Sequence, residues 1–220
     1  MNTEKYKQLI AEIKPFIAKL IAVSKTKPAE DILQFYNIGQ KIFGENKVQE
    51  MVSKYEALPK DIEWHLIGHL QTNKVKFIAP FVSMVHSVDS LKLLQEINTH
   101  AKKNNRIIDC LLQIFIADEE TKFGLSKEEL LQLLSSKEFS LLKNIRICGL
   151  MGMATNIDDE KKISNEFSQL KKLFDVVKQK YFSSESSFKE LSIGMSSDYK
   201  IALQHGATLI RVGSIIFGER

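Results

Sequence analysis

The sequence is poor in cysteine, proline and tryptophan, and it has no long apolar run. Its 220 residues include only two cysteines, four prolines and one tryptophan, which disfavours a disulfide-stapled secreted fold. Cys110 and Cys148 each lie inside an apolar stretch, so we expect buried free thiols in a reducing compartment. No stretch is long and apolar enough to cross a bilayer, and the polar start lacks a signal-peptide core. We therefore expect a cytoplasmic protein without membrane contact.

Several functional signatures are also missing. The net charge is only +4, and the basic residues are almost all lysines scattered among glutamates, so the sequence predicts no nucleic-acid partner. It has no Gly-x-Gly-x-x-Gly after the first strand, no Walker loop and no Gly-x-Ser-x-Gly elbow. No cysteine and histidine grouping has zinc spacing, so no metal is expected. The length suits a single domain, residues 1–220.

What the sequence does have is a regular alternation of short β-branched runs and amphipathic stretches of helical period. An extra N-terminal helix is expected over 3–14, ended by Pro15. Eight strands are expected near 19–23, 41–44, 63–68, 81–87, 107–116, 144–152, 189–194 and 207–213, and helices near 29–36, 45–55, 72–79, 90–103, 127–135, 158–181 and 199–205. Alternating elements predict a parallel sheet, and eight units favour a (β/α)₈ barrel. An open doubly wound sheet is the alternative.

In such a barrel the reactive site lies at the carboxyl ends of the strands. Lys25 follows the run "LIAV" at the end of the first strand. A lysine amine attacks a carbonyl when it is neutral, and a desolvated pocket or a nearby cation favours that form. The alternative is a solvated surface lysine, which is what we expect for Lys27. Asn46 follows the second strand, and Met151 and Met153 follow the sixth.

The last two strands end in glycine and serine. "SIGMSSD" places Ser196 and Ser197 before a helix, and "RVGSIIFG" places Gly213 and Ser214 before a helical turn. The corresponding loops of these barrels commonly form a phosphate cup, since exposed amides at a helix start attract a dianion. Simple helix capping is the alternative. An amine and a phosphate cup together indicate a phosphorylated aldehyde or ketone, either pyridoxal phosphate or an aldolase substrate.

Arg211 and His65 both fall inside predicted strands. For Arg211 the alternatives are a salt bridge to a neighbouring strand and a hydrogen bond to a cofactor's pyridine nitrogen. A guanidinium keeps its own proton, so such a nitrogen would stay unprotonated and the ring would be a weaker electron sink. His65 is expected to be a hydrogen-bonded core residue, and His86 is expected to be structural or solvated.

The motifs "AVSKTKP", "FGENKVQE", "WHLIGHLQTNK", "GLMGM", "LSIGMSSDY" and "GATLIRVGSIIFGER" resemble those of the pyridoxal phosphate homeostasis proteins, also called proline synthase co-transcribed homologs. The resemblance covers nearly the whole chain. It implies a barrel of the alanine racemase N-terminal type, with the cofactor held by Lys25 as a Schiff base. It further implies Arg211 at the pyridine nitrogen, Asn46 beside the ring, and Ser196, Gly213 and Ser214 at the phosphate, with Met195 also among the cofactor-binding residues. Ser214 stands where many members have threonine, which keeps the hydroxyl.

The resemblance implies that the protein holds pyridoxal phosphate and maintains vitamin B6 homeostasis without substantial catalysis, and that pyridoxal-phosphate-dependent apoenzymes receive the cofactor. Alanine racemases carry a further β-domain with a tyrosine acid/base, and we expect no counterpart in this sequence. Two-base racemisation needs a proton donor on each face of the substrate carbon. A weak racemase or Schiff-base aldolase is the alternative, with Tyr36, Tyr55 or Tyr199 as the missing acid.

Overall fold

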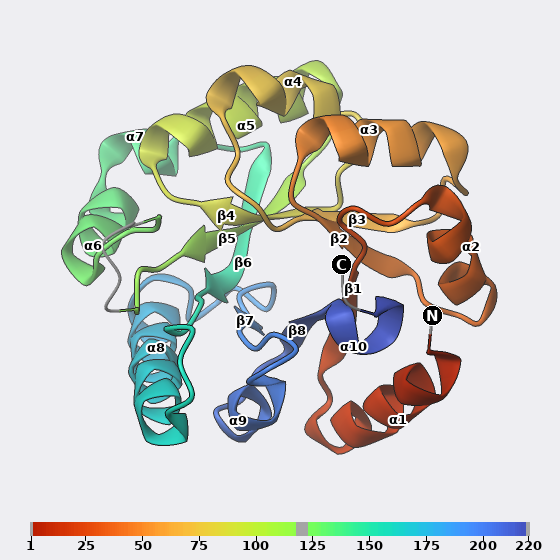
Figure 1. Cartoon of the computed structure of the whole chain (residues 1–220). Helices are drawn as coiled ribbons and strands as arrows, with labels where there is room; N and C mark the ends of the chain where they lie inside the picture. Colours follow the sequence, from red (N-terminus) through yellow and green to blue (C-terminus); the bar gives the residue numbers. More distant parts are fainter. Residues whose placement is uncertain (1, 118–122, 219–220) are drawn as a thin grey trace.

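The computed structural model describes residues 2–117 and 123–218. Over these residues, eight parallel strands pair in chain order from β1 to β8 and close into a barrel. Helices surround the barrel, and the N-terminal helix α1 lies beside the C-terminal helix α10 (Figure 1). The predicted (β/α)₈ barrel with an extra N-terminal helix is confirmed, and the open doubly wound sheet is wrong.

The strands are short runs of mostly buried residues, as the apolar pattern predicts. They are β1 Lys19–Val23, β2 Ile42–Glu45, β3 Glu63–Leu66, β4 Met84–Val88, β5 Ile108–Gln113, β6 Ile145–Met151, β7 Glu190–Ser192 and β8 Leu209–Val212. β1 and β8 close the barrel through a register that runs from Lys19 opposite Leu209 to Ala22 opposite Val212.

The helices follow the predicted order with small shifts at their ends. They are α1 Thr3–Ile13, α2 Ala29–Asn37, α3 Val48–Ala57, α4 Val75–Ile78, α5 Leu91–Lys103, α6 Lys127–Ser135, α7 Lys137–Ser140, α8 Glu160–Tyr181, α9 Tyr199–Gln204 and α10 Ser214–Phe217, with 3₁₀ turns η1 Lys14–Phe16 and η2 Thr72–Lys74. Pro15 lies in η1, where its missing N–H ends the α-helical pattern. Short α7 was not predicted. None of the helices in the described segments is long and apolar enough to pass through a bilayer.

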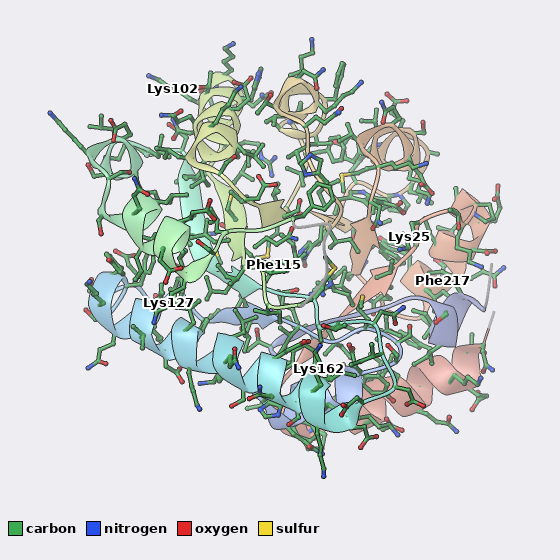
Figure 2. All side chains as sticks on the ribbon, turned by 60° about the vertical axis from the view of Figure 1, so that its left-hand side comes forward. Lys25, Lys102, Phe115, Lys127, Lys162 and Phe217 are labelled. Carbon is green, nitrogen blue, oxygen red and sulfur yellow. The ribbon has the colours of Figure 1, made fainter. Side chains whose placement is uncertain are left out.

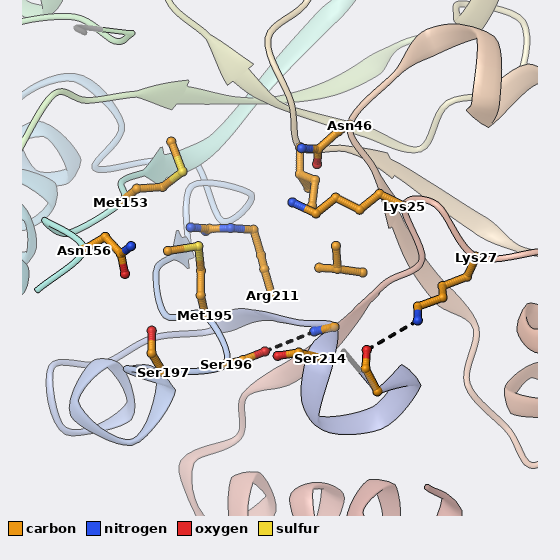
Figure 3. A pocket seen from close by; sticks show the side chains of 14 residues that line it. Lys25, Lys27, Asn46, Met153, Asn156, Met195, Ser196, Ser197, Arg211 and Ser214 are labelled. Atoms are coloured by element: carbon orange, nitrogen blue, oxygen red, sulfur yellow. Dashed lines mark hydrogen bonds between the residues drawn. The ribbon is translucent and has the colours of Figure 1, made fainter. Parts of the chain in front are cut away.

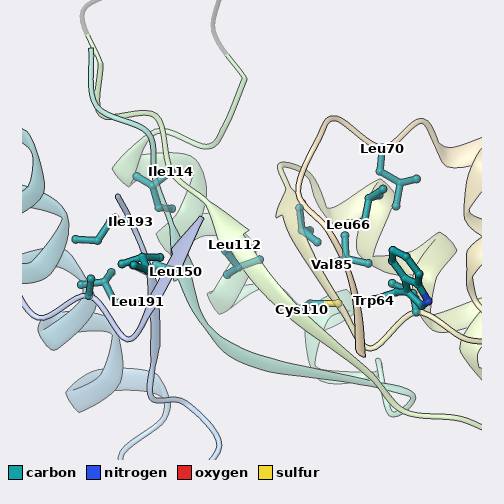
Figure 4. Close-up of a cluster of buried hydrophobic side chains, with 14 of the residues drawn as sticks. Trp64, Leu66, Leu70, Val85, Cys110, Leu112, Ile114, Leu150, Leu191 and Ile193 are labelled. Atoms are coloured by element: carbon teal, nitrogen blue, oxygen red, sulfur yellow. The ribbon is translucent and has the colours of Figure 1, made fainter. Parts of the chain in front are cut away.

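The core has two parts, because residues along each strand face alternately outward and inward. The outer part packs strands against helices and includes Trp64, Leu66 and Leu112 (Figure 4). The inner part fills the barrel with Ile21, Met84, Leu111, Cys148, Met151 and Leu209.

Cys110 and Cys148 are buried and free, as predicted. Burial raises the pKa of both thiols, that of Cys148 to about 12, so both stay protonated at neutral pH.

Candidate functional site

The predicted site residues converge on one cavity at the carboxyl ends of the strands. Lys25 follows β1 and Asn46 follows β2, while the residues from the other end of the chain come from β8 and the loops after β7 and β8. All seven line a cavity of about 560 Å³ (Figure 3), namely Lys25, Asn46, Met195, Ser196, Arg211, Gly213 and Ser214. That volume is within the range of small-molecule sites. Lys102, by contrast, extends outward from α5 (Figure 2).

Arg211 projects from β8 into the barrel, where it is almost completely buried. It donates hydrogen bonds to the Ser192 backbone oxygen at 2.8 Å, to Ser192 Oγ at 2.6 Å and to the Gly152 oxygen at 3.1 Å. These bonds use three of the five N–H groups of a guanidinium. Among the described residues no carboxylate pairs with Arg211, so the alternative of a salt bridge to a neighbouring strand is wrong. Burial lowers the pKa of Arg211 to about 10, and it remains a cation at neutral pH.

A chain of neutral groups continues from Arg211 across the barrel interior. Ser192 Oγ lies 3.0 Å from His86 Nδ1, and His86 Nε2 lies 2.9 Å from His65 Nδ1. Burial lowers the pKa of His65 to about 3 and that of His86 well below its ordinary value. Both imidazoles are therefore uncharged at neutral pH, which confirms the prediction of a hydrogen-bonded core role for His65.

The loops after β7 and β8 meet at the lower edge of the cavity in Figure 3. The Gly213 amide donates to Ser196 Oγ at 3.3 Å, and the Asp198 carboxylate accepts from the Met195 amide at 2.5 Å. A Cβ atom at Gly213 would lie 2.9 Å from the Val23 backbone oxygen, so only glycine lets β8 end this close to β1. Ser196 and Ser214 thereby come to the same side of the cavity.

The loop after β6 contributes Met153, which the strand-end rule singles out, and Asn156, which it does not. Met153 and Asn156 line the cavity. Glu166, buried on α8, holds this loop by accepting hydrogen bonds from the Thr155 amide at 2.8 Å and from Thr155 Oγ1 at 2.7 Å. Met151, predicted to lie near the site, belongs instead to the interior of the barrel. No pattern in the sequence indicated the role of Glu166, which depends on α8 packing beside the loop.

Lys27 differs from its prediction as a solvated surface lysine. Its side chain lines the cavity and donates hydrogen bonds to the backbone oxygens of Phe217 at 3.2 Å and Gly218 at 3.4 Å. These oxygens lie at the carboxyl end of α10, where the helix dipole favours a cation. Lys27 therefore connects the loop after β1 to the carboxyl end of α10.

The cavity suits an anionic ligand. Three of the described lining residues are charged, and all three are basic: Lys25, Lys27 and Arg211. The described lining contains no acidic residue, no aromatic residue and no histidine.

The three candidate tyrosines lie elsewhere: the Tyr36 hydroxyl donates to Asp61, Tyr55 stacks on Phe81, and the Tyr199 hydroxyl donates to Glu12. The described residues also contain no group of three or more side chains that could hold a metal ion.

The fold and the cavity define a (β/α)₈ barrel with a lysine, an arginine and paired serine loops at its carboxyl mouth. A family model described as the alanine racemase N-terminal domain matches residues 2–220. A pyridoxal phosphate homeostasis protein of Aquifex aeolicus is 42% identical over 205 residues, which cover 92% of this chain and 87% of that protein. The protein of the same name from Synechocystis is 39% identical, with 98% and 97% covered. The chain therefore belongs to the pyridoxal phosphate homeostasis proteins of the alanine racemase N-terminal domain family.

A solved structure supports the same assignment. PipY of Synechococcus elongatus, solved without pyridoxal phosphate, has a TM-score of 0.92 and 34% sequence identity, covering 99% of this chain and 100% of that chain. The structure of PipY with pyridoxal phosphate bound has a TM-score of 0.88. The barrel described above is thus shared along the full length of PipY.

Proposed function

We propose that this protein binds pyridoxal 5′-phosphate through Lys25 and serves vitamin B6 homeostasis. The observation that carries the proposal is the meeting of Lys25, Arg211 and the Ser196 and Ser214 loops on one cavity. This donor set fits the cofactor, which has an aldehyde, a pyridine nitrogen and a dianionic phosphate. The relatives that share the barrel are named for this role, and PipY has been solved with the cofactor bound.

Each residue has a defined task in this proposal. When bound, the cofactor supplies an aldehyde to which a neutral lysine amine adds with loss of one water, so that a C=N bond replaces the C=O bond. Lys25 provides that amine, Ser196, Gly213 and Ser214 provide hydroxyl and amide donors for the phosphate, and Asn46 and Met195 pack beside the ring. Arg211 keeps its proton and faces the pyridine nitrogen, which favours retention of the cofactor over strong carbanion stabilisation.

Borohydride reduction tests the site. The protein is incubated with pyridoxal phosphate, reduced and digested, and the modified peptide is identified by mass spectrometry. We expect the label on Lys25, and we expect Lys25→Ala to lose both the label and the visible absorbance of the bound cofactor while keeping its melting temperature. Lys27→Ala is the matched control, because Lys27 lines the same cavity and should leave the label on Lys25. A label on another lysine of the unaltered protein would refute the assignment.

We further infer that turnover is slight and that the protein passes its cofactor to apoenzymes. Racemisation needs an acid/base group on each face of the substrate carbon. The described cavity lining offers lysines but no tyrosine, histidine or carboxylate, which disfavours the alternative of a racemase or aldolase. Incubation with single amino-acid enantiomers in deuterated water tests this inference, since fast α-proton exchange that depends on Lys25 would show an enzyme.

A further inference from the structure

Three charged side chains, two of them buried and one partly exposed, form a cluster behind the loop that carries Lys25. Lys54 Nζ, on α3, donates hydrogen bonds of 2.7 Å each to Glu45 Oε1, Glu50 Oε1 and the Ser24 backbone oxygen. All three ammonium hydrogens are therefore used. The side chain of Lys54 is only 8% exposed and that of Glu45 is fully buried. We call Glu45, Glu50 and Lys54 the Lys54 cluster.

The Lys54 cluster holds the chain on both sides of Lys25. Before it, Ser24 Oγ donates to Glu45 Oε1 at 2.6 Å, and the Ser24 backbone oxygen accepts from Lys54. After it, the Thr26 amide donates to Glu50 Oε1 at 2.5 Å. The backbone that presents Lys25 is thus clamped between two residues that both bind the same cluster.

The clamped backbone is strained. Thr26 has a φ of 66°, a left-handed conformation that is unfavourable for a β-branched residue. Such a conformation is energetically unfavourable and persists where the surrounding structure restrains it. The bond from the Thr26 amide to Glu50 supplies that restraint, because a change of φ would turn the amide away from the carboxylate. Relaxation of Thr26 would also redirect the neighbouring Lys25.

Stability alone does not account for this arrangement. Buried ion pairs often contribute less than apolar residues of the same size. Glu45 Oε2 is buried and has no hydrogen-bond partner among the described residues, and burial raises the pKa of Glu45. Such a cluster is energetically unfavourable, and so is the strained residue beside it. Both are expected where the position of a functional side chain has to be fixed.

We propose that Lys54 is a positioning residue, which with Glu45 and Glu50 fixes the Ser24–Thr26 backbone so that the Lys25 amine is presented to the barrel mouth. The inference rests on the proposed function, because it assigns Lys25 the covalent attachment. Lys54 itself does not line the cavity and acts through the backbone on either side of Lys25.

The test separates covalent attachment from binding. Lys54→Met removes the ammonium but keeps an unbranched side chain, and Lys92→Met alters an exposed lysine on α5 as the matched control. The rate of attachment is followed by the visible absorbance at saturating pyridoxal phosphate. Affinity is measured with pyridoxamine 5′-phosphate, which has no aldehyde and cannot attach. Amide hydrogen exchange is measured for the peptide containing residues 24–27.

For Lys54→Met we expect attachment to slow by roughly tenfold or more, the scale for a misplaced reacting group. Affinity for pyridoxamine 5′-phosphate should stay within about twofold, because the phosphate loops are intact, and exchange at Thr26 should become faster. Lys92→Met should change none of the three. An unchanged attachment rate would overturn the proposal, and so would an equal loss of attachment and analogue affinity, which would indicate general damage to the cavity.

A second variant covers the case in which Lys54→Met does not fold. Glu50 is 23% exposed, and Glu50→Met keeps an unbranched side chain while removing the oxygen that accepts from the Thr26 amide and from Lys54. Slower attachment with unchanged analogue affinity would support the proposal, whereas an unchanged rate would overturn it. If the proposed function itself is wrong, the unaltered protein will form no bond at Lys25. That result differs from one in which only the variants attach the cofactor slowly.

Discussion

Lowering the pH from 7 to 5 should destabilise the barrel through its two interior histidines. His65 and His86 are buried and hydrogen bonded to each other at 2.9 Å, and burial lowers the pKa of His65 to about 3. In the unfolded chain an imidazole titrates near its ordinary value of about 6.5. Below that pH the unfolded state binds protons that the folded state does not, so stability is full above about pH 6.5 and is lost as the pH falls toward about 3.

The size of the effect follows from the linkage between proton binding and folding. One proton taken up only by the unfolded state costs about 1.4 kcal/mol of stability per pH unit. Between pH 6.5 and 5, His65 alone should therefore cost about 2 kcal/mol. The pKa of His86 is shifted in the same direction, so the pair adds to the effect. A loss of this size is a large part of the roughly 5–15 kcal/mol typical of a folded domain.

Urea unfolding at pH 7 and pH 5 measures the effect in the unaltered protein and in His65→Gln. The variant should lose about 2 kcal/mol less stability on acidification. Burial raises the pKa of Glu45 and Asp198, and these groups act with the opposite sign, but they are common to both proteins and cancel in the difference. His100→Gln, which alters a histidine paired with Glu96 on α5, is the control. Equal acid dependence in His65→Gln and the unaltered protein would refute the assignment.

Three further substitutions test the cavity. Arg211→Ala should weaken cofactor binding and lower stability by about 1–3 kcal/mol in urea unfolding, because Ser192 loses its buried donor. Ser196→Ala should weaken cofactor retention by about 1–2 kcal/mol in equilibrium dialysis, the scale of one hydrogen bond to a charged group. Glu166→Gln should lower stability by about 1–2 kcal/mol, because one amide oxygen replaces the two carboxylate oxygens that accept from Thr155. An unchanged melting temperature would contradict the role of Glu166 in holding the loop after β6.

Much of the site could be predicted because a barrel converts sequence position into spatial position. Lys25, Asn46, Ser196 and Gly213 each follow a recognisable strand, and closure brings the strand ends to one mouth. Element boundaries were less accurate. The apolar run 107–116 predicted one long strand, but β5 ends at Gln113, because apolarity continues into the loop where Ile114 and Ile116 still pack.

Residues that act through tertiary contacts could not be predicted in the same way. Glu50 and Lys54 are four positions apart on α3, a spacing also typical of exposed helix pairs. Only the packing of α3 beside the ends of β1 and β2 buries Lys54, leaves Glu50 partly exposed and brings the pair to Ser24 and Thr26. The sequence likewise predicts a solvated Lys27, because nothing local indicates that α10, almost two hundred positions away in the sequence, supplies its acceptors.

The uncharged state of the two interior histidines bears on the cavity as well as on stability. Because His65 and His86 are neutral at neutral pH, the hydrogen-bonded chain behind Arg211 places no second positive charge beside the guanidinium. The hydrogen bonds of this buried cation within the described residues go to neutral oxygen atoms, and the charge of Asp198 only partly offsets the lowering of its pKa by burial. A buried charge is stabilised when an opposite charge approaches through a water-poor environment. An anionic ligand at the barrel mouth would provide that charge, so the arrangement that orients Arg211 also favours retention of such a ligand.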